Sequence, residues 1–567
     1  MRTGKAGSAA AVWKLCTFRG LALKNAERAA LALPFGLFAL PLALALPLAL
    51  TQAADPQAWR ALLADPQMPR ALALSVSTAL LSTAVALAVC LALVTHLHGT
   101  ALWQRLSRAL APMLALPHAA FAIGLALLVM PAGLLARLLA PLWSWSTPPD
   151  WPTVNDLNGI GLVLVLVGKE LPFLLWNALA LLNRPDVATP LRGWLASGAT
   201  LGYSNASLWW RVLWPLLLPR LAWPLLAVLA YSLTVVDLAL IVGPASPPTL
   251  AVIAWQGLQD GDVARNAEGA AAALLLGLVL LLLVVVALLV YRAAQHAWQR
   301  IAVNGRRPRD APLAGSAVRA LMNGLLGLYV VVALLLAASS FVGVWSFPTL
   351  LPQAWTADAW HQVRNSGAVL GLSAGLAAFA AIASLVLVLC WFEAAPTAWD
   401  ARAMPWVLAP LAIPSLLLMT GLYTLALRLA LDGTLAGLAW VHMLVTLPYV
   451  FVALAPAWRS FDKRYEVTAL ALGRSRWAFW WRVKAPLLAA PLAAALAVGF
   501  AVSVAQYLPT QFIGAGRYAS VTTEAVTLAS GGQRHTAAAF AVLQALLPLL
   551  GFALAVWVGR WQHNRLR

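Results

Sequence analysis

Ionisable side chains inside long apolar stretches are the residues of this sequence best placed to do chemistry. Asp237 lies in SLTVVDLALIVGP, and Lys169 and Glu170 are adjacent in another apolar stretch. Such groups are costly within a hydrocarbon layer, so each needs a partner or a polar path. Two interpretations stay open: pairing between helices, such as Asp237 with Lys169, or a path touched by a solute. Lys169 and Glu170 occupy different helix faces, so they are not expected to pair with each other.

A second polar group occupies the corresponding stretch later in the chain, SVAQYLPTQFIGAG. It offers Gln506, Tyr507 and Gln511, which join Lys169, Glu170 and Asp237 as candidate residues of a translocation path. His442 lies in a different apolar stretch with no partnered carboxylate in its half, so we expect it to be packed and neutral rather than a proton relay.

The sequence lacks the signatures of an enzyme. The sequence contains no G-x-x-x-x-G-K-[ST] phosphate loop and no nucleophile arrangement. Its three cysteines, Cys16, Cys90 and Cys390, lie far apart without the spacing of metal ligands. The sequence therefore predicts no catalytic residue, no bound metal, no disulfide framework and no cofactor held by this chain.

Two polar segments repeat each other without a gap. Residues 195–219 read LASGATLGYSNASLWWRVLWPLLLP, and residues 466–490 read EVTALALGRSRWAFWWRVKAPLLAA. At a constant offset, Gly202, Trp209, Trp210, Arg211, Val212 and Pro215 coincide with Gly473, Trp480, Trp481, Arg482, Val483 and Pro486. Other landmarks repeat in the same order, since Pro117 and Gly124 correspond to Pro414 and Gly421. The chain therefore consists of two related, parallel halves, which are expected to enclose a path between them.

Each repeated segment predicts a short helix, a sharp turn at the glycine, and a second short helix that ends in an aromatic pair. The proline suits the first turn of the membrane helix that follows. Such a segment would be a cytoplasmic knob, fixed at its base by Trp and Arg and free to dock at its tip. An ordinary amphipathic loop at the membrane surface is the alternative, and two copies at identical spacing argue against it.

These segments resemble the EAA loop of ABC importer permeases, in which a Glu-Ala-Ala-like triplet precedes a glycine. The second copy, YEVTALALG with Glu466, Ala469 and Gly473, is closer to the pattern; the first lacks the acidic residue and has Gly198 at a usual Ala position. The whole chain resembles fused permeases of iron(III), thiamine and YnjC-like systems, and KELPFLLWNAL is most similar to the last.

That resemblance implies a type I importer fold, a pair of ATPase subunits that use ATP, and a periplasmic binding protein that delivers the solute. A proton-coupled secondary transporter with twelve helices is the alternative, but Asp237, Glu170 and His442 form no obvious relay. A membrane-embedded synthase or transferase would need a reactive polar cluster near one interface, and the sequence shows none. Thiamine, iron(III) and other small solutes stay open.

The elements that position these residues follow from composition. With 62% hydrophobic residues, 10% charged residues and a mean hydropathy of +0.82, the chain is predicted to be an all-α polytopic membrane protein. Apolar windows predict twelve helices in two sets of six, near 29–51, 71–95, 108–133, 159–182, 221–243, 268–292, 318–344, 367–392, 403–429, 434–457, 487–508 and 537–559.

Lys and Arg set the orientation. Residues such as Arg184, Arg211, Arg464 and Arg482 collect on one side, which is therefore cytoplasmic together with both termini. The net charge of +19 thus reflects topology in a bacterial inner membrane, not binding to nucleic acid. The predicted domains are a cytoplasmic segment (1–28), a first permease module (29–292), a cytoplasmic linker (293–317) and a second module (318–567). The first helix is longer than a signal-peptide core and is expected to be retained.

Overall fold

The computed structural model describes residues 25–302, 304 and 312–566, and within them the protein is built from helices. The pairing of Val342 with Trp355 is an isolated bridge outside any strand. This confirms the prediction of an all-α fold. Most of the predicted N-terminal segment 1–28, and Arg306, Arg307 and Arg309 of the predicted linker, lie outside the described residues.

The helices before the linker are α2 (Asn25–Pro34), α3 (Leu40–Gln52), α4 (Pro56–Ala64), α5 (Met68–Leu97), α6 (Ala101–Ala115), α7 (His118–Val129), α8 (Leu134–Trp143), α9 (Ile160–Leu182), α10 (Pro185–Thr200), α11 (Asn205–Leu208), α12 (Trp214–Leu217), α13 (Ala222–Thr234), α14 (Asp237–Val242), α15 (Leu250–Leu258) and α16 (Val263–Ala302). The π-helical segments η1 (Phe35–Ala39) and η2 (Trp209–Leu213) and the 3₁₀ segment η3 (Leu218–Leu221) connect some of them.

The helices after the linker are α17 (Pro312–Ser339), α18 (Asp358–Asn365), α19 (Gly367–Ala394), α20 (Asp400–Ala412), α21 (Ser415–Arg428), α22 (Leu435–Arg459), α23 (Arg464–Ala471), α24 (Arg476–Phe479), α25 (Ala485–Leu487), α26 (Ala489–Val504), α27 (Leu508–Gly514), α28 (Val521–Ser530) and α29 (Arg534–Leu566). The 3₁₀ segment η4 (Thr397–Trp399) precedes α20, and the π-helical segment η5 (Trp480–Lys484) lies between α24 and α25.

Membrane spans agree with the predicted number. Within the described residues, ten helices are long and apolar enough to cross a membrane, and the number reaches twelve if each of two bent helix pairs is one span. The bounds differ at the linker, because α16 continues to Ala302 and α17 already begins at Pro312, and in the fifth span, which is Asn205–Thr234. The chain is thus a polytopic all-α membrane protein.

Four helices predicted as continuous are broken. The predicted helix 108–133 breaks between α6 and α7, and 403–429 breaks between α20 and α21, where the axis turns by 101°. Pro117 and Pro414 cause both breaks, because the residue before a proline is driven out of the helical region. Leu116 and Ile413 accordingly have extended backbones, with ψ of 118° and 135°.

The other two breaks also occupy corresponding positions. The predicted helix 221–243 is divided into α13 and α14, and 487–508 ends with α26 before α27 begins. Extended backbone at Val235 makes the first break, and at the second α27 begins at Leu508 with Pro509 in its first turn. Both breaks lie in the interior of the protein, so they expose backbone and side-chain polar groups where a path would run.

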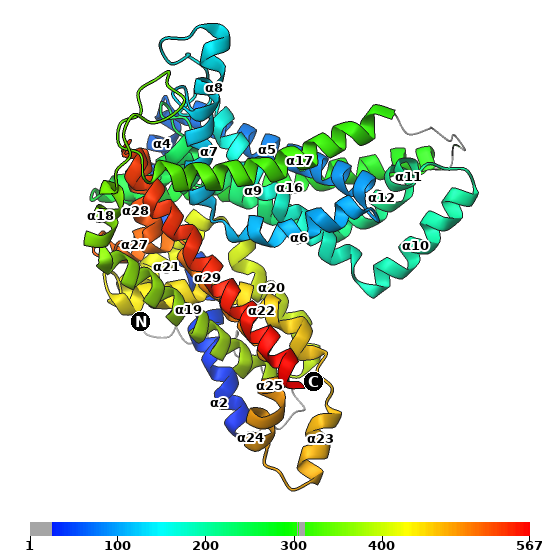
Figure 1. Ribbon diagram of the computed structural model, residues 1–567. Coiled ribbons are helices and arrows are strands. Elements are labelled where there is room, and N and C mark those ends of the chain that lie inside the picture. Colours follow the sequence, from blue (N-terminus) through cyan, green and yellow to red (C-terminus); the bar gives the residue numbers. More distant parts are fainter. Residues whose placement is uncertain (1–24, 303, 305–311, 567) are drawn as a thin grey trace.

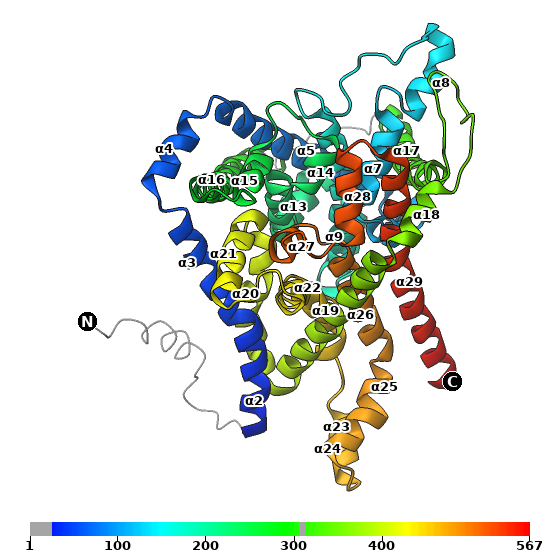
Figure 2. The same ribbon diagram turned by 90° about the vertical axis from the view of Figure 1, so that its left-hand side faces the viewer.

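The first helix of each half packs on the opposite half. α2 and α3 lie along α19 and α21, whereas α17 lies along α7 (Figure 2). Helices before the predicted linker therefore pack against helices after it, and the first helix after the linker packs against a helix before it. The division into modules 29–292 and 318–567 remains a prediction from the sequence repeat. In the structure, each module uses helices of the other module to bury its own.

Two corresponding glycines make these exchanged contacts possible. A Cβ at Gly124 would lie 2.6 Å from Val332 Cγ1 and 2.9 Å from Leu336 Cγ of α17. A Cβ at Gly421 would overlap the carbonyl oxygen of Ala45 in α3. Small residues that allow close approach are typical of helix contacts within membranes. At Gly421 the obstacle is backbone, which a rotamer change cannot remove.

Replacing Gly421 with Val is therefore expected to lower the free energy of unfolding by about 3 kcal/mol or more, since overpacking against backbone has no local relief. Thermal unfolding of the detergent-purified chain measures the effect. Gly324→Val is the matched control, because Gly324 is an exposed glycine of α17 with open space at its Cβ position. Equal melting temperatures for the two variants would contradict the proposed contact.

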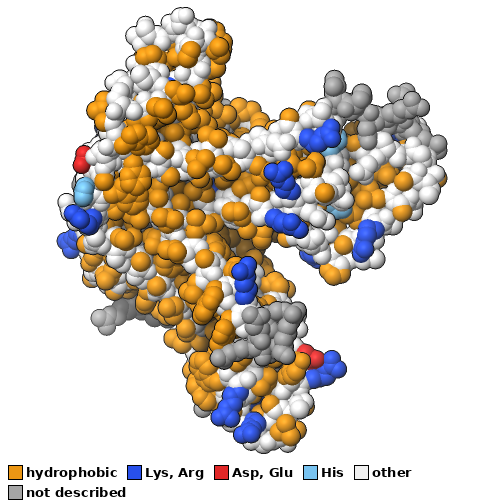
Figure 3. Space-filling view, viewed as in Figure 1, with side chains coloured by type: hydrophobic (Ala, Val, Ile, Leu, Met, Phe, Trp, Pro, Cys, Tyr) orange, Lys and Arg blue, Asp and Glu red, His pale blue; other side chains and the backbone are white. Residues whose placement is uncertain are grey.

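Two arms diverge from a common body. One arm carries α6, α10, α11 and α12, and the other carries α22 to α25 (Figure 1). The space-filling view shows a cleft between the arms (Figure 3). The cleft opens toward the side on which both repeated segments lie, so the protein is open on that side.

Candidate functional site

The two repeated segments form the same turn. Gly202 and Gly473 have φ of +79° and +76°, which favours glycine because a Cβ is disfavoured there. In the first turn the N–H of Tyr203 donates to Gly198 O at 3.1 Å, and the N–H of Gly202 donates to Ala199 O at 3.0 Å. This pair of bonds is the Schellman arrangement that ends a helix. The predicted sharp turn is confirmed in the first copy.

The second copy repeats these bonds residue for residue. The N–H of Arg474 donates to Ala469 O, and that of Gly473 donates to Leu470 O, both at 3.0 Å. A serine then begins the next short helix in each copy: Ser204 Oγ accepts from Ser207 N, and Ser475 Oγ accepts from Ala478 N. Sequence repetition therefore corresponds to an identical helix, turn and helix at the end of each arm.

A π-helical turn follows in both segments, as η2 and η5. Pro215 and Pro486 come directly afterwards, in the first turn of the short helices α12 and α25. The prediction placed them in the first turn of the membrane helices, but the candidate spans already begin at Asn205 and Arg476, so both prolines lie inside them. The difference arises because the wider π turn accommodates a residue that has no N–H to donate.

Aromatic packing anchors the first segment. Trp209 is fully buried, with its ring 5.3 Å from His98 and 5.1 Å from Trp214 between centroids. Trp214 Nε1 donates to Thr95 Oγ1 of α5 at 2.8 Å. Burial lowers the pKa of His98, which favours a neutral ring against Trp209. The base of this segment is thus part of the core.

Arg211 adds a polar anchor, since Nη1 donates to Ile301 O at 2.9 Å and to Asn304 Oδ1 at 2.7 Å. These bonds attach the segment to the end of α16. Trp210 and Val212 point outward and are exposed. The predicted anchoring by Trp and Arg therefore holds for the first segment, with one tryptophan of the pair facing inward.

The second segment is anchored differently. Trp480 Nε1 and Lys484 Nζ both donate to Glu393 Oε1, at 2.9 Å and 2.7 Å. Lys484 also lies 4.0 Å from the centroid of the Trp458 ring. Arg482 is exposed, as is Trp481. The sequence predicted that an arginine, Arg482, anchors this segment. Lys484 anchors it instead, because Lys484 lies on the helix face toward Glu393.

The departure of the first copy from the Ala pattern has a packing reason. A Cβ at Gly198 would lie 2.5 Å from Leu208 Cδ1, so an alanine there would require the Leu208 side chain to move. In the second copy Ala469 takes the place of Gly198, and the residue matching Leu208 is Phe479, which is buried. The two copies therefore close the same turn with different side chains.

The tip of the second segment is exposed and apolar. α23 contains no buried residue, and Val467, Leu472 and Trp477 are 66%, 74% and 72% exposed. Glu466 lies on this helix, with Oε1 3.8 Å from Arg476 Nε. An exposed apolar tip on an anchored base is the form of a docking element.

In the interior, Lys169 binds the end of α6. Its Nζ donates to Leu116 O at 2.6 Å and to Met113 O at 3.2 Å. The break at Pro117 leaves these last carbonyls of α6 without helical partners, and the ammonium group fills that role. The ammonium group of Lys169 therefore binds the end of α6 and not Asp237, the pairing that the sequence had left open.

Glu170 faces the other way, as expected from its position on α9. Its Oε1 is buried, lies 3.6 Å from His118 Nε2, and has no hydrogen-bond partner. The His118 ring is 5.0 Å from that of Tyr231. Sequence reasoning missed His118 and Tyr231, although His118 directly follows the repeated landmark Pro117.

The remaining candidate residues lie near this point from both halves. Asp237 begins α14 and interacts electrostatically with His118. Tyr507 interacts with Asp237 and is hydrogen-bonded to Gln511. Tyr449 of α22, also missed, interacts with Glu170 and Tyr231. We call Glu170, His118, Tyr231, Asp237, Tyr449 and Tyr507 the vertex cluster; Gln506 is half-buried beside it.

His442 lies outside the vertex cluster. It is buried, with Nδ1 2.9 Å from Ser503 Oγ and Nε2 3.0 Å from Thr510 Oγ1. Its two ring nitrogens are satisfied by hydroxyl groups of the same half. The expectation of a packed histidine is confirmed.

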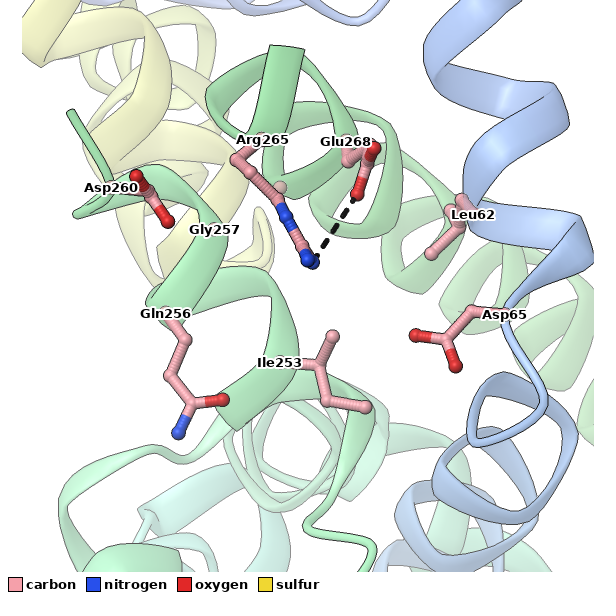
Figure 4. Close-up of a pocket in the computed structure, with 9 residues that line it drawn as sticks. Leu62, Asp65, Ile253, Gln256, Gly257, Asp260, Arg265 and Glu268 are labelled. Carbon is pink, nitrogen blue, oxygen red and sulfur yellow. Dashed lines mark ion pairs between the residues drawn. The ribbon is translucent and has the colours of Figure 1, made fainter. Parts of the chain in front are cut away.

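A separate pocket of about 130 Å³ lies on the side opposite the repeated segments, between α4, α15 and α16. Asp65 and Asp260 stand at opposite edges of it, and Arg265 points toward Glu268 at 3.8 Å (Figure 4). Within the described part of the chain, no group of three or more His, Cys, Asp or Glu side chains could hold a metal ion.

The membrane helices and the two matched turns define the class of a transport permease, and the comparisons agree. The profile of a family described as "Binding-protein-dependent transport system inner membrane component" matches residues 392–567. The chain is 37% identical to the inner membrane ABC transporter permease protein YnjC of Escherichia coli over 509 residues, 89% of this chain and 90% of that protein. It is also 29% identical over 164 residues, 27% of this chain, to the molybdenum transport system permease protein ModB of Mycobacterium tuberculosis, covering 61% of ModB.

This chain therefore belongs to the family of inner-membrane ABC transporter permeases. It is a transport component, multi-pass in the inner membrane, of a family that works with ATPase and binding-protein partners.

Proposed function

We propose that this chain is the permease subunit of an ABC importer, which forms the solute path and couples it to ATP hydrolysis through the segments around Gly202 and Gly473. One observation carries the proposal: the same Schellman turn ends both arms, each with an anchored base. Two docking elements fit two ATPase subunits, which would use the ATP, while this chain would hold no cofactor and no ATPase site of its own.

The geometry of the arms supports this arrangement. The cleft between the arms opens on the side of the two segments (Figure 3). Drawing the segments together would narrow that opening, which is the change that alternating access requires of parallel halves. A periplasmic binding protein would deliver the solute on the opposite side.

Topology follows from the same arrangement. α2 begins and α29 ends on the side where α23 and α24 lie (Figure 2). If that side binds the ATPases, it is cytoplasmic, and both termini are cytoplasmic too. This agrees with the orientation that Lys and Arg predict.

We propose that the solute is thiamine, iron(III) or another small solute. The ModB match covers 27% of this chain, so it supports a shared architecture more than a molybdenum solute. Selection of the solute would lie partly with the binding protein.

Co-purification tests the coupling proposal. The tagged chain, expressed with the ATPase subunit of its own transport system, is expected to bring down two ATPase copies for each chain. Purified alone, it should hydrolyse no ATP. Solute uptake by the chain alone in liposomes, driven by a proton gradient, would overturn the proposal and favour a secondary transporter.

A further inference from the structure

The two repeated segments present exposed apolar side chains at corresponding positions of their tips. Leu201 and Leu472 directly precede the glycines of the two turns and are 59% and 74% exposed. Trp194 and Tyr465 also correspond to each other, and both are exposed. Exposed apolar side chains at the end of an anchored arm favour contact with a partner. The apolar part of the two tips therefore fits the same kind of partner surface.

The tips differ in charge. Residues 193–208 of the first segment contain no Lys, Arg, Asp or Glu. The corresponding residues 464–479 of the second segment contain three Arg and one Glu, so this stretch carries a net charge of +2. Arg192 and Lys463 precede the two stretches at corresponding positions and do not distinguish the segments. The first tip is therefore apolar and neutral, whereas the second is apolar and positively charged.

Two arginines after the turn account for most of this difference. Arg474 and Arg476 lie where the first segment has Tyr203 and Asn205. Arg474 is exposed, and within the described residues its side chain takes part in no ion pair. Arg476 Nε lies 3.8 Å from Glu466 Oε1, but the two side chains are 70% and 38% exposed. Ion pairs between exposed side chains are weak, so both arginines can bind a partner.

The place of the two arginines favours a protein partner over lipid headgroups. α23 and α24 are the part of their arm that lies farthest from the common body in both views (Figure 1, Figure 2). Lys and Arg side chains lie at the end of this arm (Figure 3). The turn itself does not need them, because the backbone N–H groups of Gly473 and Arg474 close it. A positive edge around an apolar tip is complementary to acidic side chains around an apolar contact site.

We propose that Arg474 and Arg476 bind acidic side chains of the ATPase subunit around the site that receives Leu472, and that the first segment binds its ATPase without such ionic contacts. The proposal rests on the proposed function, because it takes the ATPase subunits as partners of the two segments. Charge attraction between partners mainly speeds association and makes it depend on salt. The second interface is therefore the stronger of the two at low ionic strength, and salt reduces the difference.

Variants with one blocked segment separate the two interfaces. Gly202→Asp leaves the second segment for docking, and Gly473→Asp leaves the first. Each full-length variant, in phosphatidylcholine nanodiscs, is titrated with the ATPase subunit of its own system at about 0.02 M and about 0.5 M salt, between which the Debye length falls several-fold. With salt, the Kd should rise roughly tenfold or more for Gly202→Asp and less than about twofold for Gly473→Asp. Equal salt dependence of the two variants would overturn the proposal.

Exchanging matched residues between the two copies tests the arginines themselves. Arg476 and Asn205 each begin a short helix and are exposed, so their exchange should leave the fold intact. Arg476→Asn combined with Arg474→Gln should remove most of the salt dependence of the second segment. Asn205→Arg should introduce salt dependence into the first segment. If neither exchange alters the salt dependence, the two arginines do not bind the ATPase.

Arg364→Gln is the matched control, because Arg364 is an exposed arginine of α18, at the opposite end of the molecule from α23 (Figure 1). It should leave the Kd unchanged at both salt concentrations. The titrations are repeated in nanodiscs that contain anionic lipid. A salt-dependent difference between the segments that appears only with anionic lipid would assign the arginines to lipid headgroups and overturn the proposal.

Failure of this proposal and failure of the coupling proposal give different results. ATPase binding with equal salt dependence at both segments contradicts only the role of Arg474 and Arg476. The absence of ATPase binding by the unaltered chain at either salt concentration contradicts the coupling proposal itself.

Discussion

Replacing Gly473 with Asp is expected to abolish ATP-coupled uptake while the protein stays folded in the membrane. The residue has φ of +76°, and no atom lies within 4 Å of the position that a Cβ would occupy. The cost to folding is therefore limited to the left-handed backbone, about 1–2 kcal/mol, and Asp tolerates this region better than most residues. The added carboxylate lies at the exposed tip, where it would disturb an apolar docking surface. Uptake and ATPase co-purification measure the loss.

Gly532→Asp is the matched control for this experiment. Gly532 has φ of +79°, open space at its Cβ position, and an exposed place before α29, on the side opposite the docking segments. It should carry the same backbone cost and keep uptake. If Gly473→Asp and Gly532→Asp transport equally, the segment around Gly473 is not a coupling element.

Replacing Trp209 with Ala is expected to destabilise the chain by about 3–5 kcal/mol, because a fully buried indole is removed from between His98 and Trp214. The corresponding change, Trp480→Ala, removes a half-buried ring and one hydrogen bond to Glu393, so we expect about 1–2 kcal/mol. Thermal unfolding of the two purified variants gives the comparison.

The two tryptophans serve as controls for each other, since they occupy the same position of the repeat. Trp209→Phe should recover most of the stability lost in Trp209→Ala, because Trp209 Nε1 makes no hydrogen bond and the loss is one of packing. A larger loss for Trp480→Ala than for Trp209→Ala would show that the asymmetry in burial does not govern the two anchors.

Helix positions and the repeat were predictable for a simple physical reason. A membrane span must bury about 20 successive residues in hydrocarbon, so apolar length alone locates it. The turns at Gly202 and Gly473 were predictable because a glycine between two short helices, repeated at identical spacing, indicates a left-handed position. Pro117 and Pro414 themselves indicate the two breaks. A hydropathy profile does not detect them, because proline is apolar and leaves the mean hydropathy of the window unchanged.

The candidate path was only partly predictable. Glu170, Asp237 and Tyr507 stood out because their side chains are unusual in apolar stretches. Lys169 was grouped with them, and the structure adds that its ammonium group binds backbone carbonyls freed by the helix break at Pro117. His118 and Tyr449 were missed, since neither is rare near a helix end or interface.

The sequence by itself determined the class of protein, the number of spans to within the two bent pairs, and the paired turns, because each depends on residues close together in the chain. Only the tertiary structure decided that the first helix of each half packs on the other half, and that residues of five helices, with Tyr507 before α27, meet at the vertex cluster. Those contacts depend on which helix faces come together around Gly124 and Gly421, and hydropathy carries no information about the direction a face points.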